Sequence, residues 1–356
     1  VLRAAELSPG DAAFTEACVA QGMIRVDDIN GAREQVPSVG PVPKNIAADN
    51  RFNAALSYLA QARGRPNLTI RCDTLVDRVR FEGERAIGVV TSTGEEIDAD
   101  LVVLAAGAYF TPGILNRSGY GNEEDLSSLG IPVRQALPGV GQNLLDHPFS
   151  IEVLGGALVP EAEYGRQLQG QAMARSRGTT SPDEIDCHIY NAQGYDPDLE
   201  RWALSISVSL VNARSAGTVS LTSTDPSAAP RIEHRHYRDT QDLERMLDGV
   251  EMAREIYYSA PLTEIVEDLP DRYWNWSDRD SLTELVLARS QTTNHCSGTA
   301  KMGPSSDPLA VVDNAGRVYG AESLVVADSS IFPTCPRGNI HFPVVAAAEK
   351  VVAGLL

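Results

Sequence analysis

Two histidines near the C-terminal end of the sequence have neighbours typical of catalytic residues. His295 lies in the segment TTNHCSGTAKMG, and His341 lies in PTCPRGNIHFPVV. A neutral imidazole accepts a proton near neutral pH, and a second imidazole can hydrogen-bond the oxygen of the same substrate. Two such side chains in one place would remove a proton and orient a substrate. A lone histidine is more often structural, and we expect that role for His188, His234 and His236.

Two apolar strands are expected to place a ligand near these histidines. The segment SLVVADSSIFP is apolar up to Ala327 and Asp328 and then turns, and residues 101–105 form a second apolar run that ends at Ala106 and Gly107. Small residues or a helix start after a strand allow a cofactor to approach closely. An Asp at such a turn is also a common helix N-cap, and small residues also permit tight packing. Both interpretations stay open at these positions.

The remaining sequence predicts a mixture of strands and helices. Glu82-Gly83 and Thr93-Gly94 are predicted hairpin turns. Residues 150–182 have no strong pattern and are predicted to be a loop or lid, whereas residues 183–235 alternate as an antiparallel sheet with one covered face does. Amphipathic helices are predicted over residues 51–63, 239–259, 282–290 and 343–356.

The composition is that of a globular protein and excludes several classes. The chain has 356 residues, 43% apolar and 22% charged, with no apolar run as long as a membrane span. Its net charge of −18 argues against binding to nucleic acid or to an anionic membrane surface. The five cysteines show neither a zinc-binding spacing nor a disulfide framework. We therefore expect no metal site and a reducing, cytoplasmic location.

Five segments in a fixed order carry a family resemblance. They are ARGRPNLTIRCDTLVDRVRFEGERAIGV, LVVLAAGAYFTPGILNRSG, LGIPVRQALPGVGQNLLDHP, NHCSGTAKMG and VDNAGRVYGAESLVVADSSIFPTCPRGNIHFPVVAAAEKV. Together they resemble the glucose–methanol–choline (GMC) oxidoreductases, a family of FAD enzymes, over nearly the whole chain. The resemblance implies an α/β (mixed α+β) fold in which a Rossmann-like FAD-binding domain is interleaved with an antiparallel-sheet substrate domain.

The resemblance implies a discontinuous FAD-binding domain over residues 1–150 and 291–356 and a substrate domain over residues 151–290. The family's GxGxxG turn, which holds the FAD pyrophosphate, is not found in this sequence; GVGQNL at residues 139–144 has two of its glycines. We therefore expect the FAD-binding domain to be incomplete at its N-terminus. The missing segment would be a lost part of the chain or a separate polypeptide, and residues 1–356 expressed alone should give colourless protein.

The resemblance also implies roles for individual residues. His295 would be the base that takes the hydroxyl proton of an alcohol while the hydride passes to flavin N5, and His341 would hydrogen-bond the substrate oxygen and share the proton load. Core packing, loop bracing or a solvated side chain explains several of the other positions equally well. The implied FAD contacts are Val76, Ala106, Gly107, Asn143, Ala327, Asp328, Asn339, His341, Phe342 and Pro343. The implied substrate contacts are Tyr190, Cys296 and Arg337.

Three functions fit these residues. The first is FAD-dependent oxidation of a small-molecule alcohol (a CH–OH donor) to its carbonyl, with oxygen or a quinone-type carrier as electron acceptor. The second is a flavin-bearing hydroxynitrile lyase on the same scaffold, which would use the same histidine without redox chemistry. The third is a non-catalytic partner subunit, although a decayed site would have no need to keep both histidines.

Overall fold

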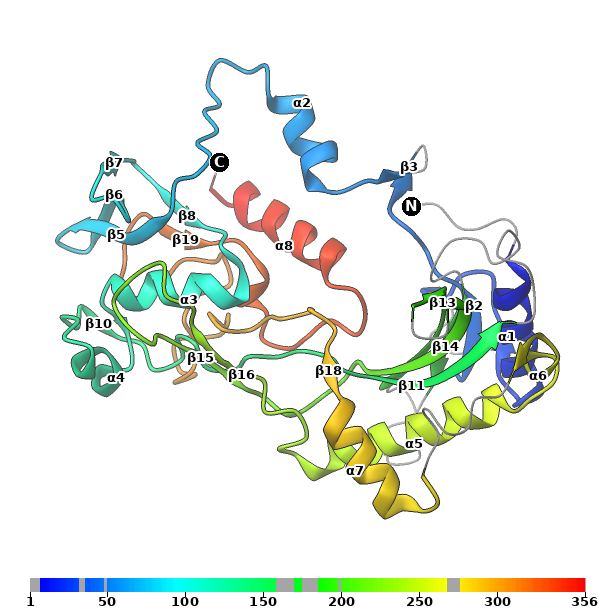
Figure 1. Cartoon of the computed structure of the whole chain (residues 1–356). Coiled ribbons are helices and arrows are strands. Elements are labelled where there is room, and N and C mark those ends of the chain that lie inside the picture. Colours follow the sequence, from blue (N-terminus) through cyan, green and yellow to red (C-terminus); the bar gives the residue numbers. More distant parts are fainter. Residues whose placement is uncertain are drawn as a thin grey trace. The chain divides into compact units, whose positions relative to one another are not determined.

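The chain folds into two compact units. The computed structural model describes residues 7–31, 36–47, 50–157, 170–174, 185–197, 200–267 and 276–355. Contacts between Cα atoms group the chain into two units, each built from three separate stretches, whose elements are labelled in Figure 1. Unit 1 consists of Val1–Ile70, Pro148–Leu210 and Thr240–Gln291, and unit 2 consists of Arg71–His147, Val211–Asp239 and Thr292–Leu356.

Unit 1 is built on a largely antiparallel sheet. Its strands follow the order β1-β2-β12-β13-β14-β11-β17, with β18 paired to β11; β1 and β2 are parallel, and the later neighbours in this order are antiparallel. Helix α5 (Thr240–Tyr257) packs on β14, where Leu204, Ile206 and Val208 are fully buried. The strands are β1 (Ile24–Arg25), β2 (Ser38–Pro41), β11 (Pro148–Ala157), β12 (Gly170–Ala174), β13 (Cys187–Asp196), β14 (Arg201–Leu210), β17 (Val266–Glu267) and β18 (Gln291–Thr292). The predicted antiparallel sheet with one helix-covered face is confirmed.

Short elements complete unit 1. Helix α1 (Pro9–Ala20) begins at Ser8, whose Oγ accepts a hydrogen bond from the backbone N–H of Asp11, and α7 (Arg279–Arg289) begins with a capping box at Asp278. The others are β3 (Ile46–Ala47), β4 (Asn50–Arg51), a π-helical turn over Ala55–Leu59, α2 (Ala60–Ala62) and α6 (Leu262–Ile265). The predicted helix over residues 51–63 is therefore shorter than expected, and its apolar residues Phe52 and Leu56 are exposed.

Unit 2 contains a parallel strand pair that carries the predicted ligand edge. Strands β8 (Val102–Leu104) and β19 (Leu324–Val326) are parallel and in register from Val102 opposite Leu324 to Leu104 opposite Val326. Helix α3 (Gly107–Arg117) follows β8, and a short 3₁₀ turn (Ser329–Ile331) follows β19. Since the strands are parallel, both segments start at the same edge of the sheet. The two strands lie in the main core cluster of the unit.

The rest of unit 2 surrounds this pair. Strands β5 (Val76–Glu82), β6 (Arg85–Thr91) and β7 (Glu96–Asp98) form an antiparallel sheet whose turns contain Gly83 and Gly94, both with positive φ, which confirms the two predicted hairpins. The remaining elements are β9 (Tyr120–Gly121) beside β10 (Gln135–Ala136), α4 (Glu123–Ser128), β15 (Thr218–Ser220) beside β16 (Arg231–Glu233), and α8 (His341–Ala353).

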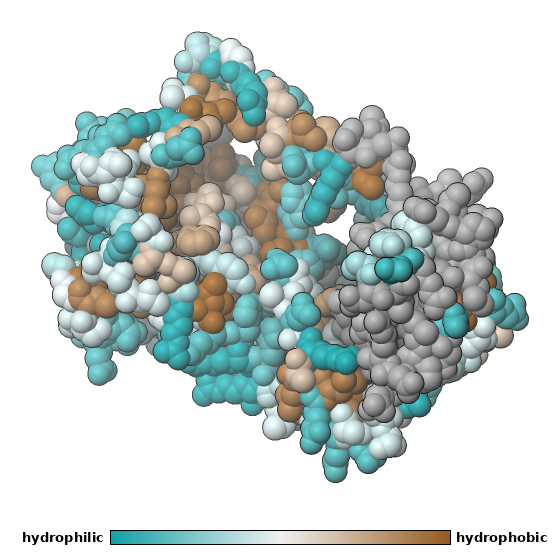
Figure 2. All heavy atoms as spheres, viewed as in Figure 1, coloured by the Kyte–Doolittle hydropathy of each residue, from teal (hydrophilic) through white to brown (hydrophobic). Residues whose placement is uncertain are grey.

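Helix α8 presents much of its apolar surface to solvent. Within it only Val351 is buried, whereas Phe342 is 50% and Val352 is 45% exposed. On β8, Val103 is 42% exposed between two buried neighbours. Figure 2 shows apolar residues at the surface where Figure 1 places α8. Parallel strands are normally covered on both faces, so this surface is suited to burial against a further segment.

Two predictions about organisation need correction. The predicted boundary at residue 150 is wrong for the N-terminal part, because residues 1–70 group with the antiparallel sheet, to which β1 and β2 belong. Residues 211–239, predicted to belong to the substrate domain, group with unit 2 instead. The predicted loop over residues 150–182 contains most of β11 and all of β12, because backbone pairing does not need an apolar pattern; residues 158–169 and 175–182 lie outside the described part.

Candidate active site

His295 is positioned by a backbone link between two segments that are far apart in the sequence. Leu145 and Ser297 exchange two backbone hydrogen bonds of 2.9 Å each. This pairing sets Asp146 and His147 alongside His295, whose backbone N–H donates to Oδ1 of Asp146 at 3.0 Å. Thr293 also donates, from its Oγ1, to the backbone carbonyl of His147 at 3.2 Å. The residue before the histidine, Asn294, has a φ of +61°, which turns the chain at this point.

Both ring nitrogens of His295 have polar neighbours. Its Nδ1 lies 2.9 Å from Nδ1 of His147, and the two rings meet edge to face with centroids 5.0 Å apart. Its Nε2 lies 3.3 Å from Nδ2 of Asn339. The ring itself is half-buried, whereas Asn339 is exposed and His147 is fully buried. The imidazole therefore has one protected nitrogen and one that faces accessible space.

The environment of His295 favours its neutral form. Burial lowers the pKa of the imidazole below its ordinary value, and the negative charge of Asp146 raises it by a smaller amount. A neutral imidazole at neutral pH is the form that can accept a proton. The same carboxylate would stabilise the imidazolium once it has formed.

His341 lies at the start of α8, close in sequence to the residue that contacts His295. It is the first helical residue, and no side chain caps the helix N-terminus. Within the described residues no hydrogen bond joins His341 to His295, and the contact from this segment to His295 is made by Asn339, two positions earlier. The structure thus brings Asn339 to His295 directly, and the predicted pairing of the two imidazoles over a substrate stays a prediction.

A thiol lies behind the histidine pair. Sγ of Cys335 is 3.1 Å from Nε2 of His147 and 3.7 Å from the carbonyl oxygen of His295, to which the thiol donates. Burial raises the pKa of this thiol to about 12, so it keeps its proton at neutral pH. Cys335, His147 and His295 therefore form a continuous polar chain.

A second polar group adjoins this chain. Asp146, His234 and Cys296 each have a side-chain atom of a kind that can bind a metal ion, and these three atoms lie within 4.8 Å of one another. The hydroxyl of Tyr109 contacts both Nε2 of His234, at 3.2 Å, and Sγ of Cys296, at 2.7 Å. Nδ1 of His234 lies 3.4 Å from Oδ2 of Asp146, and Nε2 of His236 lies 3.9 Å from the same oxygen. The contacts of Tyr109 are hydrogen bonds, whereas Oδ2 of Asp146 and Nδ1 of His234 form no hydrogen bond within the described residues, and the two histidines lie at ion-pair distances from this buried oxygen.

The carboxylate of Asp328 stabilises the fold through hydrogen bonds. Its Oδ2 accepts hydrogen bonds from the backbone N–H of Gly107 at 2.8 Å and from Oγ1 of Thr111 at 2.6 Å. Its Oδ1 accepts two more from the backbone N–H and Oγ of Ser330. Each carboxylate oxygen thus holds two donors, so the capping role that the sequence left open is present, and a cofactor would have to be contacted by other groups.

The other predicted cofactor positions are divided between several elements of unit 2. Val76 is the first residue of β5, Ala106 is the N-cap of α3, and Ala327 follows β19 and donates its backbone N–H to Leu104. Asn143 has a φ of +57° and donates from Nδ2 to the carbonyl of Gly298 at 3.3 Å, so it braces the His295 segment. Phe342 and Pro343 lie in the first turn of α8.

The predicted substrate residues are not all together. Tyr190 lies on β13 in unit 1, where its hydroxyl contacts Nδ1 of His188 at 3.1 Å and burial raises its pKa. Cys296 is buried beside Tyr109, and burial raises the pKa of its thiol to about 11. Arg337 is exposed in the segment before Asn339. Only Cys296 and Arg337 belong to the unit that contains His295.

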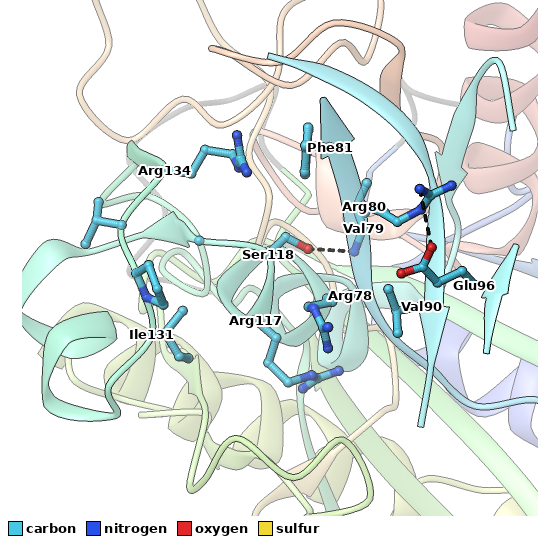
Figure 3. A pocket seen from close by; sticks show the side chains of 13 residues that line it. Arg78, Val79, Arg80, Phe81, Val90, Glu96, Arg117, Ser118, Ile131 and Arg134 are labelled. Carbon is cyan, nitrogen blue, oxygen red and sulfur yellow. Dashed lines mark hydrogen bonds and ion pairs between the residues drawn. The ribbon is translucent and has the colours of Figure 1, made fainter. Parts of the chain in front are cut away.

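A surface pocket in unit 2 does not contain the histidines. It has a volume of about 520 Å³ and lies beside the β5–β6 hairpin, with Arg78, Arg80, Arg117 and Arg134 in its lining (Figure 3). The guanidinium groups of Arg80 and Arg117 pair with Glu96 and Asp77, and that of Arg134 lies over the ring of Phe81. The guanidinium groups of Arg80, Arg117 and Arg134 therefore already have partners. None of the residues that line the pocket was predicted to belong to the active site, and we assign the pocket no part in catalysis.

Comparison with known proteins identifies the family. The N-terminal GMC oxidoreductase model matches residues 2–149, and the C-terminal GMC oxidoreductase model matches residues 213–348. The chain belongs to the GMC oxidoreductase family. The predicted family, the mixed α/β fold class, and the assignment to an FAD-dependent oxidoreductase family acting in alcohol-type oxidation are thereby confirmed.

Individual GMC relatives cover most of this chain. An uncharacterised GMC-type oxidoreductase of Rhodococcus erythropolis is 35% identical over 99% of the chain and 69% of its own length. Oxygen-dependent choline dehydrogenase 1 of Chromohalobacter salexigens is 32% identical over 95% of the chain and 66% of its own length. The crystal structure of pyridoxine 4-oxidase from Mesorbium loti superposes with a TM-score of 0.88 at 27% identity, over 99% of this chain and 70% of that one. The chain thus spans about two thirds of the length of these relatives.

The starts of α3 and α8 have features that would allow them to form part of an FAD-binding site. At Gly107, with a φ of +79°, no heavy atom lies within 4 Å of where a Cβ would be, so the start of α3 has open space beside it. The N-terminus of α8 is uncapped and can favour negative charge on a bound group. The start of α3 lies at the carboxyl edge of the β8–β19 pair, where α/β sheets bind ligands. Among the described residues β8 pairs with β19 alone, so this edge offers a place for a further strand.

The sequence missed the roles of three residues in this GMC site. Asp146 and His147 were not among the predicted site residues, and Cys335 was considered only within the cysteine count. The polar residues that flank Leu144 and Leu145 in QNLLDHP could have indicated a functional role for Asp146 and His147.

No helix in the described part of the chain is both long and apolar enough to cross a membrane.

Proposed function

We propose that this chain carries the catalytic segment of an FAD-dependent enzyme that oxidises a small-molecule alcohol to its carbonyl compound. The proposal rests on one observation. His295 is half-buried beside the uncapped start of α8, its Nδ1 is held by His147, and its Nε2 faces the exposed Asn339. A base needs such an arrangement, with one nitrogen anchored and the other open to a substrate.

The proton of the alcohol is the part of the reaction that the protein handles. Nε2 of His295 accepts the hydroxyl proton, which leaves the electron pair on oxygen available to form the carbonyl. His341, at the first position of α8, would hydrogen-bond the substrate oxygen, and Asn339 would orient the base. When bound, FAD supplies the two-electron oxidant that takes up the hydride from the carbon. The negative charge of Asp146 then stabilises the imidazolium.

The FAD would be held by backbone groups and by a further segment. Ala106 and Gly107 would approach it at the start of α3, and the first turn of α8 would face its ring system. The exposed side chains of Val103 and Phe342 would be covered by the segment that carries the GxGxxG turn, on this polypeptide or another. We expect the chain without that segment to bind FAD poorly.

Bleaching of the flavin tests the proposal. The complete flavoprotein that contains this chain should lose its yellow colour when mixed anaerobically with its alcohol substrate, and admission of oxygen with detection of hydrogen peroxide separates an oxidase from a dehydrogenase that needs another acceptor. Choline and pyridoxine are the first compounds to test, because two of the relatives are named for them. Cleavage of a cyanohydrin with unchanged flavin absorbance would instead show a lyase and contradict the proposal.

A further inference from the structure

We infer that His147 and Cys335 hold the imidazole of His295 in the tautomer that carries its proton on Nδ1 and leaves Nε2 bare. The inference rests on the proposed role of His295 and adds two positioning residues to it. Neither touches the substrate side of the ring; both act through the base.

Four contacts connect the polar chain from the helix start to the thiol. Nδ2 of Asn339 lies 3.3 Å from Nε2 of His295, and Nδ1 of His295 lies 2.9 Å from Nδ1 of His147. Nε2 of His147 lies 3.1 Å from Sγ of Cys335, and this thiol lies 3.7 Å from the carbonyl oxygen of His295. His295, His147 and Cys335 therefore form a closed loop of contacts, and Asn339 joins it at Nε2 of His295.

One placement of protons satisfies all four contacts. The thiol of Cys335 donates to the carbonyl of His295, and its sulfur accepts from Nε2–H of His147. Nδ1 of His147 is then an acceptor, so it must receive the proton of Nδ1 of His295. This leaves the lone pair on Nε2 of His295, which accepts the amide proton of Asn339 in the resting site.

The reversed placement satisfies fewer contacts. If the thiol donates to Nε2 of His147, its only proton is no longer available to the carbonyl of His295. His147 then donates from Nδ1, the proton of neutral His295 moves to Nε2, and the amide of Asn339 must turn to offer its oxygen. The reversed chain therefore loses one contact and places a proton where a base needs a lone pair.

Burial makes this selection effective. His147 is fully buried and Cys335 is half-buried, so little water can replace either partner. The thiol keeps its single proton because burial raises its pKa to about 12. When Nε2 of His295 takes up a substrate proton, the contact from Nδ1–H to His147 becomes charge-assisted and therefore stronger. The same pair that selects the tautomer then also stabilises the protonated base.

Two substitutions of His147 separate the tautomer role from simple packing. In His147→Asn, the amide oxygen can lie where Nδ1 lies and can accept from His295 as before. In His147→Gln, the amide lies near the former Nε2, where it meets Cys335 but not His295. Both variants keep a buried polar amide, so they are matched to each other in burial.

The experiment uses the complete flavoprotein and two readouts. Anaerobic stopped-flow measures the rate of flavin reduction and the apparent substrate Kd, and ¹⁵N NMR of histidine-labelled enzyme reports which nitrogen of His295 carries the proton. We expect Nδ1–H in the wild-type protein and in His147→Asn, with reduction rates within about tenfold of each other. In His147→Gln we expect a loss on the order of 10²-fold in the reduction rate, with little change in Kd, and signal from the Nε2–H tautomer.

Three results would overturn the inference. The first is a wild-type spectrum with the proton on Nε2 of His295, which does not depend on whether any variant folds. The second is equal reduction rates for His147→Asn and His147→Gln. The third is a fall in both rates with the His295 signals unchanged, which would indicate packing alone. If His295→Ala reduces its flavin at the wild-type rate, the proposed function fails separately, because the base itself is then dispensable.

Discussion

The Nδ1 atoms of His147 and His295 lie 2.9 Å apart although 148 positions separate the residues in sequence. The contact is possible because the backbones of Leu145 and Ser297 pair directly beside it. A carboxylate from the same turn, Asp146, holds the backbone N–H of His295. The base is therefore fixed both by its main chain and by its ring, which is the condition for a well-oriented proton acceptor.

The pH dependence of flavin reduction should follow the neutral form of His295. Burial destabilises the imidazolium, so its pKa is below the ordinary value and the neutral base persists to lower pH. The rate constant should rise as pH increases through that pKa and then level off, with its midpoint below pH 6.5. Among the described residues, His147 contacts the ring of His295, and the titratable groups Asp146 and Cys335 contact its backbone.

Replacement of Asp146 tests the direction in which its charge shifts the pKa of His295. The carboxylate raises the pKa of His295, so Asp146→Asn, whose amide oxygen can still accept from the backbone of His295, should move the acid limb to lower pH. Stopped-flow reduction across a pH series measures the midpoint of each protein. A midpoint that moves upward in Asp146→Asn would show that the charge of Asp146 does not act on the base as described.

The thiol of Cys335 should be replaceable by a hydroxyl but not by a hydrocarbon. Cys335→Ser keeps one donor for the carbonyl of His295 and an acceptor for His147, so flavin reduction should stay within about tenfold of wild type. Cys335→Ala removes both functions without adding volume and should slow reduction by about 10- to 100-fold, the range for partners that orient a functional residue. Equal rates in the two variants would leave the thiol without a positioning role.

Gly298 should tolerate no side chain, because it packs under the His295 segment. Its φ is +86°, and a Cβ would lie 2.4 Å from the carbonyl oxygen of Asn143. The control is Gly94→Ala, with a φ of +83° and no heavy atom within 4 Å of the added carbon, which should cost about 1 to 2 kcal/mol from backbone strain alone. Gly298→Ala should cost about 1 to 3 kcal/mol more because of the overlap. Urea denaturation followed by circular dichroism compares the two, and equal costs would contradict the packing described.

Asp328 should matter first for stability. Its carboxylate accepts four hydrogen bonds that connect the starts of α3 and the 3₁₀ turn, so Asp328→Ala should lower the free energy of unfolding by about 3 kcal/mol or more. The exposed Asp100 is the matched control, and Asp100→Asn should change the stability by less than about 0.5 kcal/mol. A stable Asp328→Ala protein that has lost only FAD affinity would favour a direct cofactor role for the side chain.

Much of the fold was predictable because local patterns determined it. Glu82-Gly83 and Thr93-Gly94 formed the predicted turns, since each glycine supplies a positive φ between strand-forming segments. The two apolar runs that end at Ala106 and at Asp328 formed the predicted strands β8 and β19, and their parallel pairing is a finding of the structure. The division into units was not predictable in the same way, because β1 and β2 are too short to show the sheet to which they belong.

The site was predictable only in part for a related reason. Sequence motifs identified His295 and the Asn339–His341 segment, and the structure places Asn339 beside the base. The partners on the other side of the ring come from distant segments, and no spacing rule connects Cys335 to His147. A lone cysteine in an apolar setting has the same pattern whether it fills space or orients a histidine, so its role depends on which residues the tertiary structure brings next to it.

Flavin reduction by His295→Ala tests the central claim most directly. In the complete enzyme, this variant should bind FAD as wild type does and should reduce it at least about 10²-fold more slowly with the same alcohol under anaerobic conditions. Cys72→Ser, which alters an exposed thiol, is the control and should keep the wild-type rate. A His295→Ala enzyme that binds FAD and reduces it at nearly the wild-type rate would contradict the account.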